Sequence, residues 1–355
     1  PIEMRHLYTF QLIEAVARAG SIRKAAEDMN LTASALTRRV QRFEQEFGAQ
    51  LFERLPKGVR LNPAGELLLH HYRASLSDLA RVQSQVADLA GERRGHVSIA
   101  CSQAMVPYFL PEQIARYRCD HPGVTFSVNV RDRTQAEQEL VSYSSDLALV
   151  FEPVYLVDFE VLHVIPQEVF AVMASDHPLA KKAEVRLRDC LDVPHVAPTT
   201  KYGVRHLLDF AARRGSRRVS PAVETESFDL IRHYVLCEKL IGFQIPLGLR
   251  EQDDGSLVFK PISSKDLPPG NLILGQMRGR TLPVASARFA LQLATALKDY
   301  QRPHRQLTER AFSGPLKPWR TSAPTVKSHC RRPGCSRHLY VRYTWHCLEC
   351  ARNFR

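Results

Sequence analysis

The sequence predicts an α/β protein that begins with a winged helix-turn-helix, continues into one long helix and ends in a larger domain. Two short amphipathic helices with a tight turn between them predict the first part, within residues 21–61. An Asn-Pro pair followed by a long apolar stripe predicts the helix. Beyond residue 91, apolar segments of strand length alternate with helical ones, as in α/β domains.

The two helices of the turn motif have recognisable starts. Ser21 and Thr32 are N-cap residues, because their side-chain oxygens can accept from amides that a helix start leaves unpaired. The apolar stripes that follow are Ile22, Ala25, Ala26 and Met29 in the first helix, and Leu36, Val40, Phe43 and Phe47 in the second. Both stripes have helical spacing, and small residues near the turn allow the helices to approach closely.

The polar face of the second helix suits DNA recognition. Hydroxyl and guanidinium groups bind base edges and phosphates in the major groove. A basic turn follows at residues 54–60, where a β-wing could lie along the phosphate backbone. A solvated face is the alternative for such arginines. The candidate DNA-binding residues are Ser21, Thr32, Ser34, Thr37, Arg38, Arg39, Arg42, Arg54, Lys57 and Arg60.

This segment resembles the winged helix-turn-helix of LysR-type transcriptional regulators. The matching residues are Phe10, Ala15, Gly20-Ser21, Ala25-Ala26, Ala35-Leu36-Thr37-Arg38, Phe43-Glu44, Phe47-Gly48, Leu51-Phe52-Glu53-Arg54 and Leu61-Asn62-Pro63-Ala64-Gly65. The resemblance implies a DNA-binding transcriptional regulator. Ala33 stands where the family often has Gln, and Asn62 stands where Thr is usual. The main candidates for base contacts are therefore Ser34, Thr37 and Arg38.

The net charge of +12 is concentrated at one end of the chain. Residues 301–355 hold 12 Lys and Arg against 2 Asp and Glu, which gives +10. Residues 1–65 hold 10 Lys and Arg against 7 Asp and Glu, which gives only +3. The DNA-binding prediction therefore depends on where the charges lie rather than on bulk basicity.

Asn62-Pro63 is a strong start signal for the long helix, with Asn as cap and Pro at the first helical position. Its apolar positions are Leu69, Tyr72, Leu76, Leu79, Val86 and Ala90. This near-heptad stripe favours pairing with a second helix, with packing against its own domain as the alternative. The family resemblance implies a linker helix that forms a homodimer or homotetramer, which presents two recognition helices to two half-sites.

After the long helix, expected strands alternate with expected helices, which predicts a parallel-sheet α/β architecture. The expected strands are 96–100, 124–130, 147–151 and 169–174, and the expected helices are 111–119, 135–143 and 285–298. This part resembles the LysR-type effector domain, which has the two-lobed periplasmic-binding-protein (type 2) fold. The marks are Leu110-Pro111, His121-Pro122, Asp146-Leu-Ala-Leu149, His177-Pro178-Leu179-Ala180 and Gly242-Phe-Gln-Ile-Pro246, although Glu238-Lys239 replaces the usual small residues.

Ligands of open α/β sheets bind beyond the carboxyl ends of strands, where helix N-termini attract anions. The candidate effector-binding residues at such places are Ser102, Gln103, Phe151, Thr199, Thr200 and Tyr202. For Ser102 and Thr199 the alternative is helix capping, and for Phe151 it is core packing. The family resemblance implies a small, carboxylate-like effector at this site.

The predicted domains are 1–62 (winged helix-turn-helix), 63–91 (linker), 92–300 (effector domain) and 301–355 (basic tail).

The sequence has no apolar signal segment and no apolar run of membrane-spanning length, so a cytoplasmic protein with no membrane contact is expected. Four cysteines of the main body, Cys101, Cys119, Cys190 and Cys237, are expected to be buried thiols. RNA polymerase is a further candidate partner, as for other regulators of transcription.

The tail ends in Cys330-x4-Cys335-x11-Cys347-x2-Cys350. Two close pairs of thiolates can bind zinc tetrahedrally, whereas a disordered tail with chance cysteines is the alternative.

No other cofactor is expected. A solute-binding protein or an enzyme could share the α/β fold, but the chain has no phosphate loop, His-Glu-x-x-His stretch or nucleophile elbow. We therefore expect a regulator rather than an enzyme.

Overall fold

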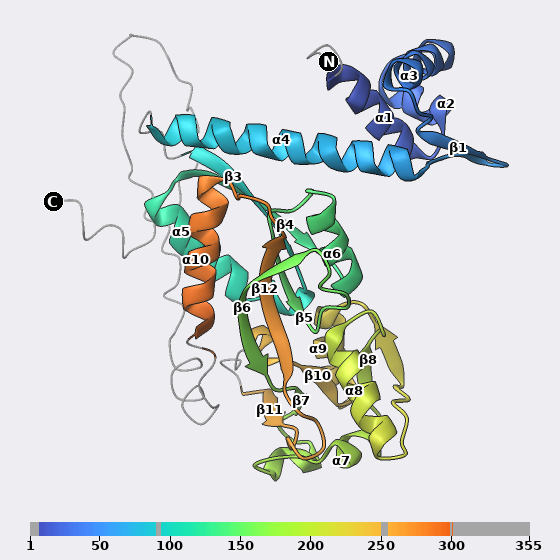
Figure 1. Cartoon of the computed structure of the whole chain (residues 1–355). Helices are drawn as coiled ribbons and strands as arrows, with labels where there is room; N and C mark the ends of the chain where they lie inside the picture. Colours follow the sequence, from blue (N-terminus) through green and yellow to red (C-terminus); the bar gives the residue numbers. More distant parts are fainter. Residues whose placement is uncertain (1–6, 90–93, 250–254, 299, 301–355) are drawn as a thin grey trace, which may run out of the picture. The chain divides into compact units, whose positions relative to one another are not determined.

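The computed structural model describes residues 7–89, 94–249, 255–298 and 300 (Figure 1). The chain divides into two compact units, each built from segments that are distant in the sequence. Of the described residues, unit 1 contains those up to Cys101, Phe126–His163 and Ile273–Ala290, and unit 2 contains Ser102–Thr125, Val164–Leu272 and those from Leu291 on. Among the described helices, none combines the length and the apolar character needed to cross a membrane.

Unit 1 begins with the predicted helix-turn-helix and wing. The elements are α1 (Leu7–Ala19), α2 (Ile22–Asp28), α3 (Ala33–Phe47), β1 (Phe52–Leu55) and β2 (Gly58–Leu61). Leu12, Ile13 and Leu36 are fully buried in one apolar core between the helices. The predicted stripe of α3 is buried only as far as Phe43, since Phe47 is exposed and stacks on the Phe43 ring at 5.6 Å.

The wing is tied to the start of the helix-turn-helix. β1 and β2 form an antiparallel hairpin, in which Arg54 lies opposite Val59. The amide of Val59 donates to the carbonyl of Gly20 at 2.9 Å. Gly58 has φ +133, and a Cβ there would lie 2.2 Å from the same carbonyl oxygen, so only glycine fits. This contact fixes the hairpin against the α1–α2 turn.

The long helix α4 runs from Pro63 to Leu89, as the Asn-Pro signal predicts. The Asn62 side chain accepts from the amide of Gly65 at 2.9 Å and donates to the carbonyl of Gln50 at 2.8 Å, so Asn acts as the cap where Thr is usual in the family. The first part of the helix packs on the core through Leu69 and Tyr72. Beyond it, a stripe of large apolar side chains is exposed, comprising Leu76, Leu79, Val82, Val86 and Leu89.

A five-stranded sheet follows, with strand order β4-β3-β5-β12-β6. The strands are β3 (Arg94–Cys101), β4 (Gly123–Val130), β5 (Leu147–Phe151), β6 (Phe159–Gln167) and β12 (Gly270–Met277), and the helices of this region are α5 (Phe109–Asp120), α6 (Arg133–Val141) and α10 (Val284–Lys298). β3 and β5 pair in parallel. β6 and β12 were not predicted from the sequence. Val124, Phe126, Val128 and Val130 alternate along β4, but only its first part is well buried, since Val124 is buried and Val128 and Val130 are exposed.

A buried ion pair holds elements of unit 1 together. Arg280 donates to Asp146 at 2.5 Å, and both side chains are less than one-tenth exposed. The Asp146 carboxylate also accepts from the hydroxyl of Ser286 at 2.8 Å and from the amide of Ser98 at 3.1 Å. Because a buried charge is costly unless it is paired and hydrogen-bonded, these contacts favour one arrangement of the chain here.

Unit 2 is only partly parallel, which corrects the predicted architecture. β7 (Phe170–Ala174) pairs antiparallel with β10 (Gly242–Gln244) and β11 (Leu257–Pro261). β8 (Val196–Pro198) and β9 (Val223–Thr225) are parallel. The helices are α7 (Leu187–Leu191), α8 (Gly203–Arg214) and α9 (Phe228–Cys237), with short 3₁₀ turns η2 (Gln103–Met105), η3 (Pro178–Lys181) and η4 (Pro246–Gly248). The strand expected at 169–174 is confirmed as β7, but its pairing direction was wrong, because a strand with two buried faces looks the same in sequence whichever way its neighbours run.

The cysteines of the main body differ in exposure. Cys101 and Cys190 are buried, and burial raises the pKa of each thiol to about 12. Cys119 is half-buried, and Cys237 at the end of α9 is exposed, so the prediction of a buried thiol is wrong for Cys237.

Candidate nucleic-acid interface and effector site

Helix α3 presents a polar face on a rigid support. The Thr32 hydroxyl accepts from the amide of Ala35 at 3.2 Å, which caps the helix as predicted. Ser21 caps α2 in the same way, through a longer contact of 3.5 Å with the amide of Lys24. The opposite face of α3 is held by buried Leu36 and Val40. The exposed face therefore has a defined direction.

The three arginines of α3 are not equivalent. Arg38 is exposed and has no ion-pair or hydrogen-bond partner among the described residues. Arg39 lies with its guanidinium carbon 4.8 Å from the centre of the Tyr8 ring, a cation–π contact with α1. Arg42 pairs with Glu46 at 3.0 Å on the exposed surface. Arg38 is thus the arginine of α3 with the most freedom to bind a base or phosphate.

The hydroxyl groups of α3 are partly committed to local contacts. Thr37 donates to the carbonyl of Ala33 at 2.7 Å, so its oxygen remains available only as an acceptor. An acceptor at this place suits the amino groups of adenine or cytosine, and the methyl group suits thymine. Ser34 lies 3.2 Å from the Thr32 hydroxyl oxygen.

The wing supplies further cations. Arg54 and Lys57 are exposed, and neither has a charged partner in the described part of the chain. Arg60 instead pairs with Glu53 across the hairpin at 2.9 Å. A groove of about 860 Å³ lies between α3 and the wing. Thr37 and Arg54 are among its lining residues, so the structure brings a predicted α3 residue and a predicted wing residue to the same groove.

Gln41 also lines this groove and was missed by the sequence analysis. It is exposed on α3, one turn after Thr37. An amide can bind adenine through two hydrogen bonds, so Gln41 belongs among the candidate base-reading residues. Its helical spacing from Thr37 is the signal that could have identified it.

All the predicted effector residues except Phe151 lie near helix starts in unit 2, but their hydrogen bonds differ from the expected ones. Ser102 precedes η2 and makes no side-chain capping bond, so the capping alternative is wrong for it. The Gln103 side-chain oxygen accepts from the amide of Phe228 at 2.9 Å, at the first position of α9. Gln103 therefore occupies a helix N-terminus where an anion could bind.

The second candidate loop follows β8. The Thr199 amide donates to the carbonyl of Thr225 at 3.2 Å, and its hydroxyl oxygen is buried without a hydrogen-bond partner among the described residues. Thr199 is not a helix cap, because α8 has Tyr202 in that place. Thr200 is exposed. The ring of Tyr202 is buried against Phe228, so it packs in the core of unit 2.

Phe151, the remaining candidate, is a core residue of unit 1. It ends β5 with 2% of its surface exposed, as its core-packing alternative states.

Gln103 and Thr199, by contrast, are connected through α9. Gln103 binds the start of this helix, and the helix packs on β8, which leads to Thr199.

A small cavity of about 40 Å³ lies in unit 2 and has room for one or two water molecules. Its lining includes Tyr108, Phe228 and Arg232. Arg232 donates to the Tyr108 hydroxyl at 3.0 Å. Asp229 of α9 also lines the cavity. The sequence analysis did not single out Arg232.

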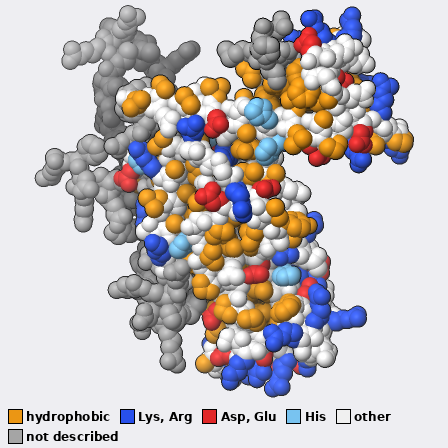
Figure 2. Space-filling view, viewed as in Figure 1, with side chains coloured by type: hydrophobic (Ala, Val, Ile, Leu, Met, Phe, Trp, Pro, Cys, Tyr) orange, Lys and Arg blue, Asp and Glu red, His pale blue; other side chains and the backbone are white. Residues whose placement is uncertain are grey.

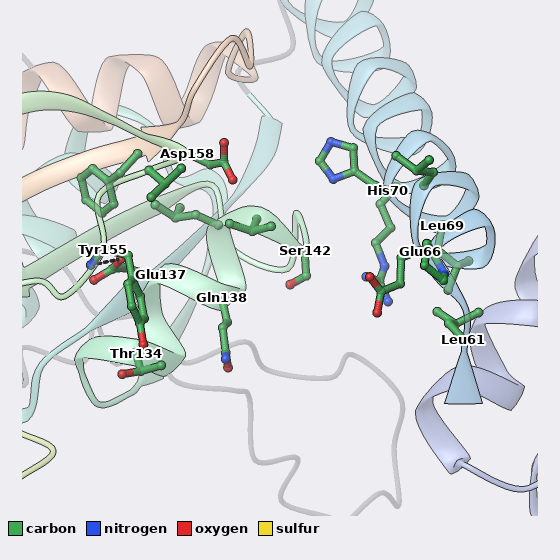
Figure 3. Close-up of a pocket in the computed structure, with 17 residues that line it drawn as sticks. Leu61, Glu66, Leu69, His70, Thr134, Glu137, Gln138, Ser142, Tyr155 and Asp158 are labelled. Atoms are coloured by element: carbon green, nitrogen blue, oxygen red, sulfur yellow. Dashed lines mark hydrogen bonds between the residues drawn. The ribbon is translucent and has the colours of Figure 1, made fainter. Parts of the chain in front are cut away.

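A larger hollow, of about 930 Å³, lies in unit 1 beside α4 and α6 (Figure 3). Figure 3 shows Glu66 and His70 on one wall and Gln138 and Tyr155 on the other. The Glu137 carboxylate accepts from the amides of Tyr155 and of the next residue, so it holds the loop after β5. None of the predicted DNA- or effector-binding residues lines this hollow.

Among the described residues, no cluster of His, Cys, Asp and Glu could hold a metal ion. The predicted zinc ligands Cys330, Cys335, Cys347 and Cys350 lie outside the described residues.

Comparison with known proteins identifies both parts of the chain. Residues 7–66 match the model of the bacterial regulatory helix-turn-helix protein, lysR family, and residues 90–298 match that of the LysR substrate binding domain. The chain is 32% identical over 215 residues to the RuBisCO operon transcriptional regulator of Allochromatium vinosum, covering 60% of this chain and 70% of that one. It is 24% identical over 229 residues to the transcriptional activator CmpR of a Synechocystis strain, covering 64% and 75%.

Solved structures show the same fold. Full-length OxyR from Pseudomonas aeruginosa, in a variant form, is similar with a TM-score of 0.62 at 18% identity, covering 81% of this chain and 94% of that chain. Full-length CbnR in complex with its target DNA is similar with a TM-score of 0.55 at 17% identity, covering 83% and 100%.

Proposed function

Because the chain belongs to the LysR family of transcriptional regulators, we propose that α3 reads operator DNA in the major groove through Ser34, Thr37, Arg38 and Gln41. Arg38 would bind guanine or phosphate, Thr37 would accept from a base amino group, and Gln41 would bind adenine. Arg54 and Lys57 of the wing, with Arg39, Arg42 and Arg60, would bind phosphates and set the register. Ser21 and Thr32 would act mainly as helix caps next to the DNA.

A single observation carries this proposal: Arg38 is exposed and unpaired among the described residues, on a helix whose other face is buried. A charge without an internal partner is available to a ligand. A helix fixed by its core also points that charge in a constant direction, which base recognition requires. The exposed pair Arg42–Glu46 is weak enough for a phosphate to replace the carboxylate.

We propose that α4 pairs with its counterpart in a second copy of the chain. The exposed residues Leu76, Leu79, Val82, Val86 and Leu89 recur at three- and four-residue steps along one side of the helix. These apolar side chains are between 39% and 90% exposed, and burying them further against a second helix is favourable. A dimer or a tetramer would place two or more recognition helices on one operator.

The effector-binding domain takes a small molecule, and we propose that an anionic one binds around Ser102, Gln103, Thr199 and Thr200. The buried Thr199 hydroxyl lacks a partner, and Arg232 supplies a nearby cation on α9. An anion that takes the amide of Phe228 has to displace Gln103, so binding would be linked to movement of η2. This difference in contacts between the two states is what allows an effector to shift their populations.

We propose domain limits of 1–62, 63–91, 92–300 and 301–355, a cytoplasmic location, and contact with RNA polymerase at the promoter. The four cysteines of the tail stay a zinc prediction. Native mass spectrometry with and without a chelator tests it: a mass difference of one zinc ion is expected, and its absence contradicts the prediction.

Selection of bound duplexes from a random DNA pool, together with genome-wide mapping of bound sites, tests the proposed function. The expected result is a motif with two inverted half-sites, separated by about 10 base pairs or a multiple of that spacing. The same motif should recur upstream of genes whose pathway suggests the effector. Binding without any enriched sequence would contradict base reading by α3.

A further inference from the structure

The exposed end of α8 in unit 2 carries an arginine cluster that DNA reading by α3 does not use. Arg213 and Arg214 form the last turn of the helix, and Arg218 follows after a tight turn. The turn is fixed by the amide of Arg217, which donates to the carbonyl of Ala212 at 2.8 Å. Basic side chains favour a helix C-terminus, which accounts for the first two arginines but not for Arg218.

The nearby carboxylates are already committed to other cations. Asp209 lies four residues before Arg213, the ordinary distance for a helical ion pair, yet it accepts from buried Arg205 at 3.0 Å. Asp192 pairs with Arg217. As a result, Arg213, Arg214 and Arg218 have no carboxylate partner in the part of the chain that is described.

The local charge is large for this molecule. The adjoining segments 181–192, 213–218 and 265–266 hold nine Lys and Arg against four Asp and Glu, a net charge of +5. The predicted DNA-binding segment 1–65 carries only +3. Figure 2 shows Lys and Arg side chains gathered at the lower end of the view, over the region of α7 and the end of α8. Such a field attracts anionic partners.

An exposed aromatic side chain lies within this charge. Phe210 is 50% exposed and lies one turn before Arg214, whose guanidinium carbon is 6.0 Å from the centre of its ring. A phosphate backbone offers nothing that matches an apolar ring. Protein interfaces, by contrast, are enriched in arginine and aromatic residues.

We propose that Phe210, Arg213, Arg214 and Arg218, here called the α8 surface, dock an acidic segment of a partner protein that carries at least one apolar side chain. The arginines would each pair with a carboxylate, because the planar guanidinium matches its geometry. Phe210 would pack on the apolar side chain. The backbone of duplex DNA offers charge to the arginines but no apolar side chain to the exposed Phe210, so it fits this surface less well than an acidic segment with an apolar residue. The proposal is independent of the base contacts of α3.

Fluorescence anisotropy of the full-length protein tests the α8 surface with three labelled probes. They are a peptide of alternating Asp and Ser around a central Leu-Phe pair, the same peptide with Ser-Ser at the centre, and a random-sequence DNA duplex. The variants are Arg213→Gln/Arg214→Gln/Arg218→Gln and Phe210→Ser. The control Arg116→Gln/Arg118→Gln/Arg278→Gln removes three other exposed, unpaired charges among the described residues.

The triple variant should weaken binding of the Leu-Phe peptide about tenfold, because it removes three exposed ion pairs that each change the equilibrium by a factor of about two. Phe210→Ser should weaken it about fivefold and leave the Ser-Ser peptide unchanged. The control should change neither by more than about twofold. Equal losses in the triple variant and the control, or no peptide binding at all, would overturn the proposal. A loss confined to the DNA duplex would also overturn it and assign the surface to phosphate.

Discussion

Arg38 on α3 and Arg280 in the effector domain carry the same guanidinium group in opposite settings. Arg38 is exposed and has no internal partner among the described residues, whereas the Arg280 side chain is 6% exposed and pairs with Asp146. A charge with a buried partner contributes to the fold and is lost to ligands. A charge without one contributes almost nothing to the fold and is free to bind DNA. A buried partner, rather than residue type, therefore distinguishes a structural arginine from one that is available to DNA in this chain.

The largest loss of stability is expected when the buried ion pair between Asp146 and Arg280 is broken. Asp146→Ala leaves the guanidinium of Arg280 buried without its carboxylate, and should lower the free energy of unfolding by about 3–5 kcal/mol. The matched change at an exposed pair, Glu53→Ala opposite Arg60, should cost less than about 1 kcal/mol. The shift of the urea midpoint, followed by circular dichroism, measures both. Similar small shifts in the two variants would remove the distinction between the two settings.

A smaller loss of stability is expected when Gln103 is replaced. Gln103→Ala leaves the amide of Phe228 without its acceptor and should destabilise the protein by about 1–2 kcal/mol. Gln103→Glu should retain most of the stability, because a carboxylate is favourable at a helix N-terminus. Urea unfolding of the two variants provides the comparison. If the alanine and glutamate variants were equally unstable, the contact with α9 would not be the cause.

His195 is a buried histidine of unit 2 whose pKa is shifted, in part by the buried Arg205. Burial lowers the pKa of His195 below its usual 6.5, a hydrogen bond to the carbonyl of Val193 opposes this, and Arg205 lowers it further. Below pH 6.5 the unfolded chain therefore binds a proton that the folded chain resists. The contribution of His195 to the free energy of unfolding is therefore fully present above pH 6.5 and is lost as the pH falls below that value.

His195→Gln should accordingly reduce the pH dependence of the unfolding free energy between pH 7 and 5, by at most about 1.4 kcal/mol per pH unit. Unfolding curves at several pH values, with His206→Gln as the exposed control, measure the difference. Parallel pH profiles for the wild type and His195→Gln would show that this ring does not titrate differently on folding.

The smallest effect on affinity is expected at the wing. Lys57→Ala should weaken operator and random DNA by the same factor and reduce the slope of log K against log salt by about 0.9, the value for one phosphate contact. Binding titrations at several salt concentrations measure it. A loss confined to the operator would instead make Lys57 a base-reading residue.

The local parts of the fold could be predicted from the sequence because their signals lie within a few residues. Ser21, Thr32 and Asn62 cap the helices they precede, and the wing forms where the basic turn was expected. LysR membership likewise followed from ordered local motifs and is confirmed by the family models.

The remaining features depend on contacts between distant residues. Asp146 and Arg280 are 134 residues apart, and so no local pattern links them. Gln103 meets α9 across 125 residues, so its role as an internal acceptor could not be foreseen. Phe159 packs where Gly275 lacks a side chain, which brings together the two strands that the sequence analysis missed.

Base reading by Arg38 can be measured as the ratio of random-DNA to operator dissociation constants, at one salt concentration, for the wild type and Arg38→Ala. Arg38→Ala should lower this ratio by about 5- to 150-fold, the value of one specific base contact, while Arg18→Ala on α1 should leave it unchanged. The thermal stability of Arg38→Ala should equal that of the wild type. An unchanged ratio with equally weakened binding to both DNAs would show that Arg38 contacts phosphate only, and would contradict base reading by this residue.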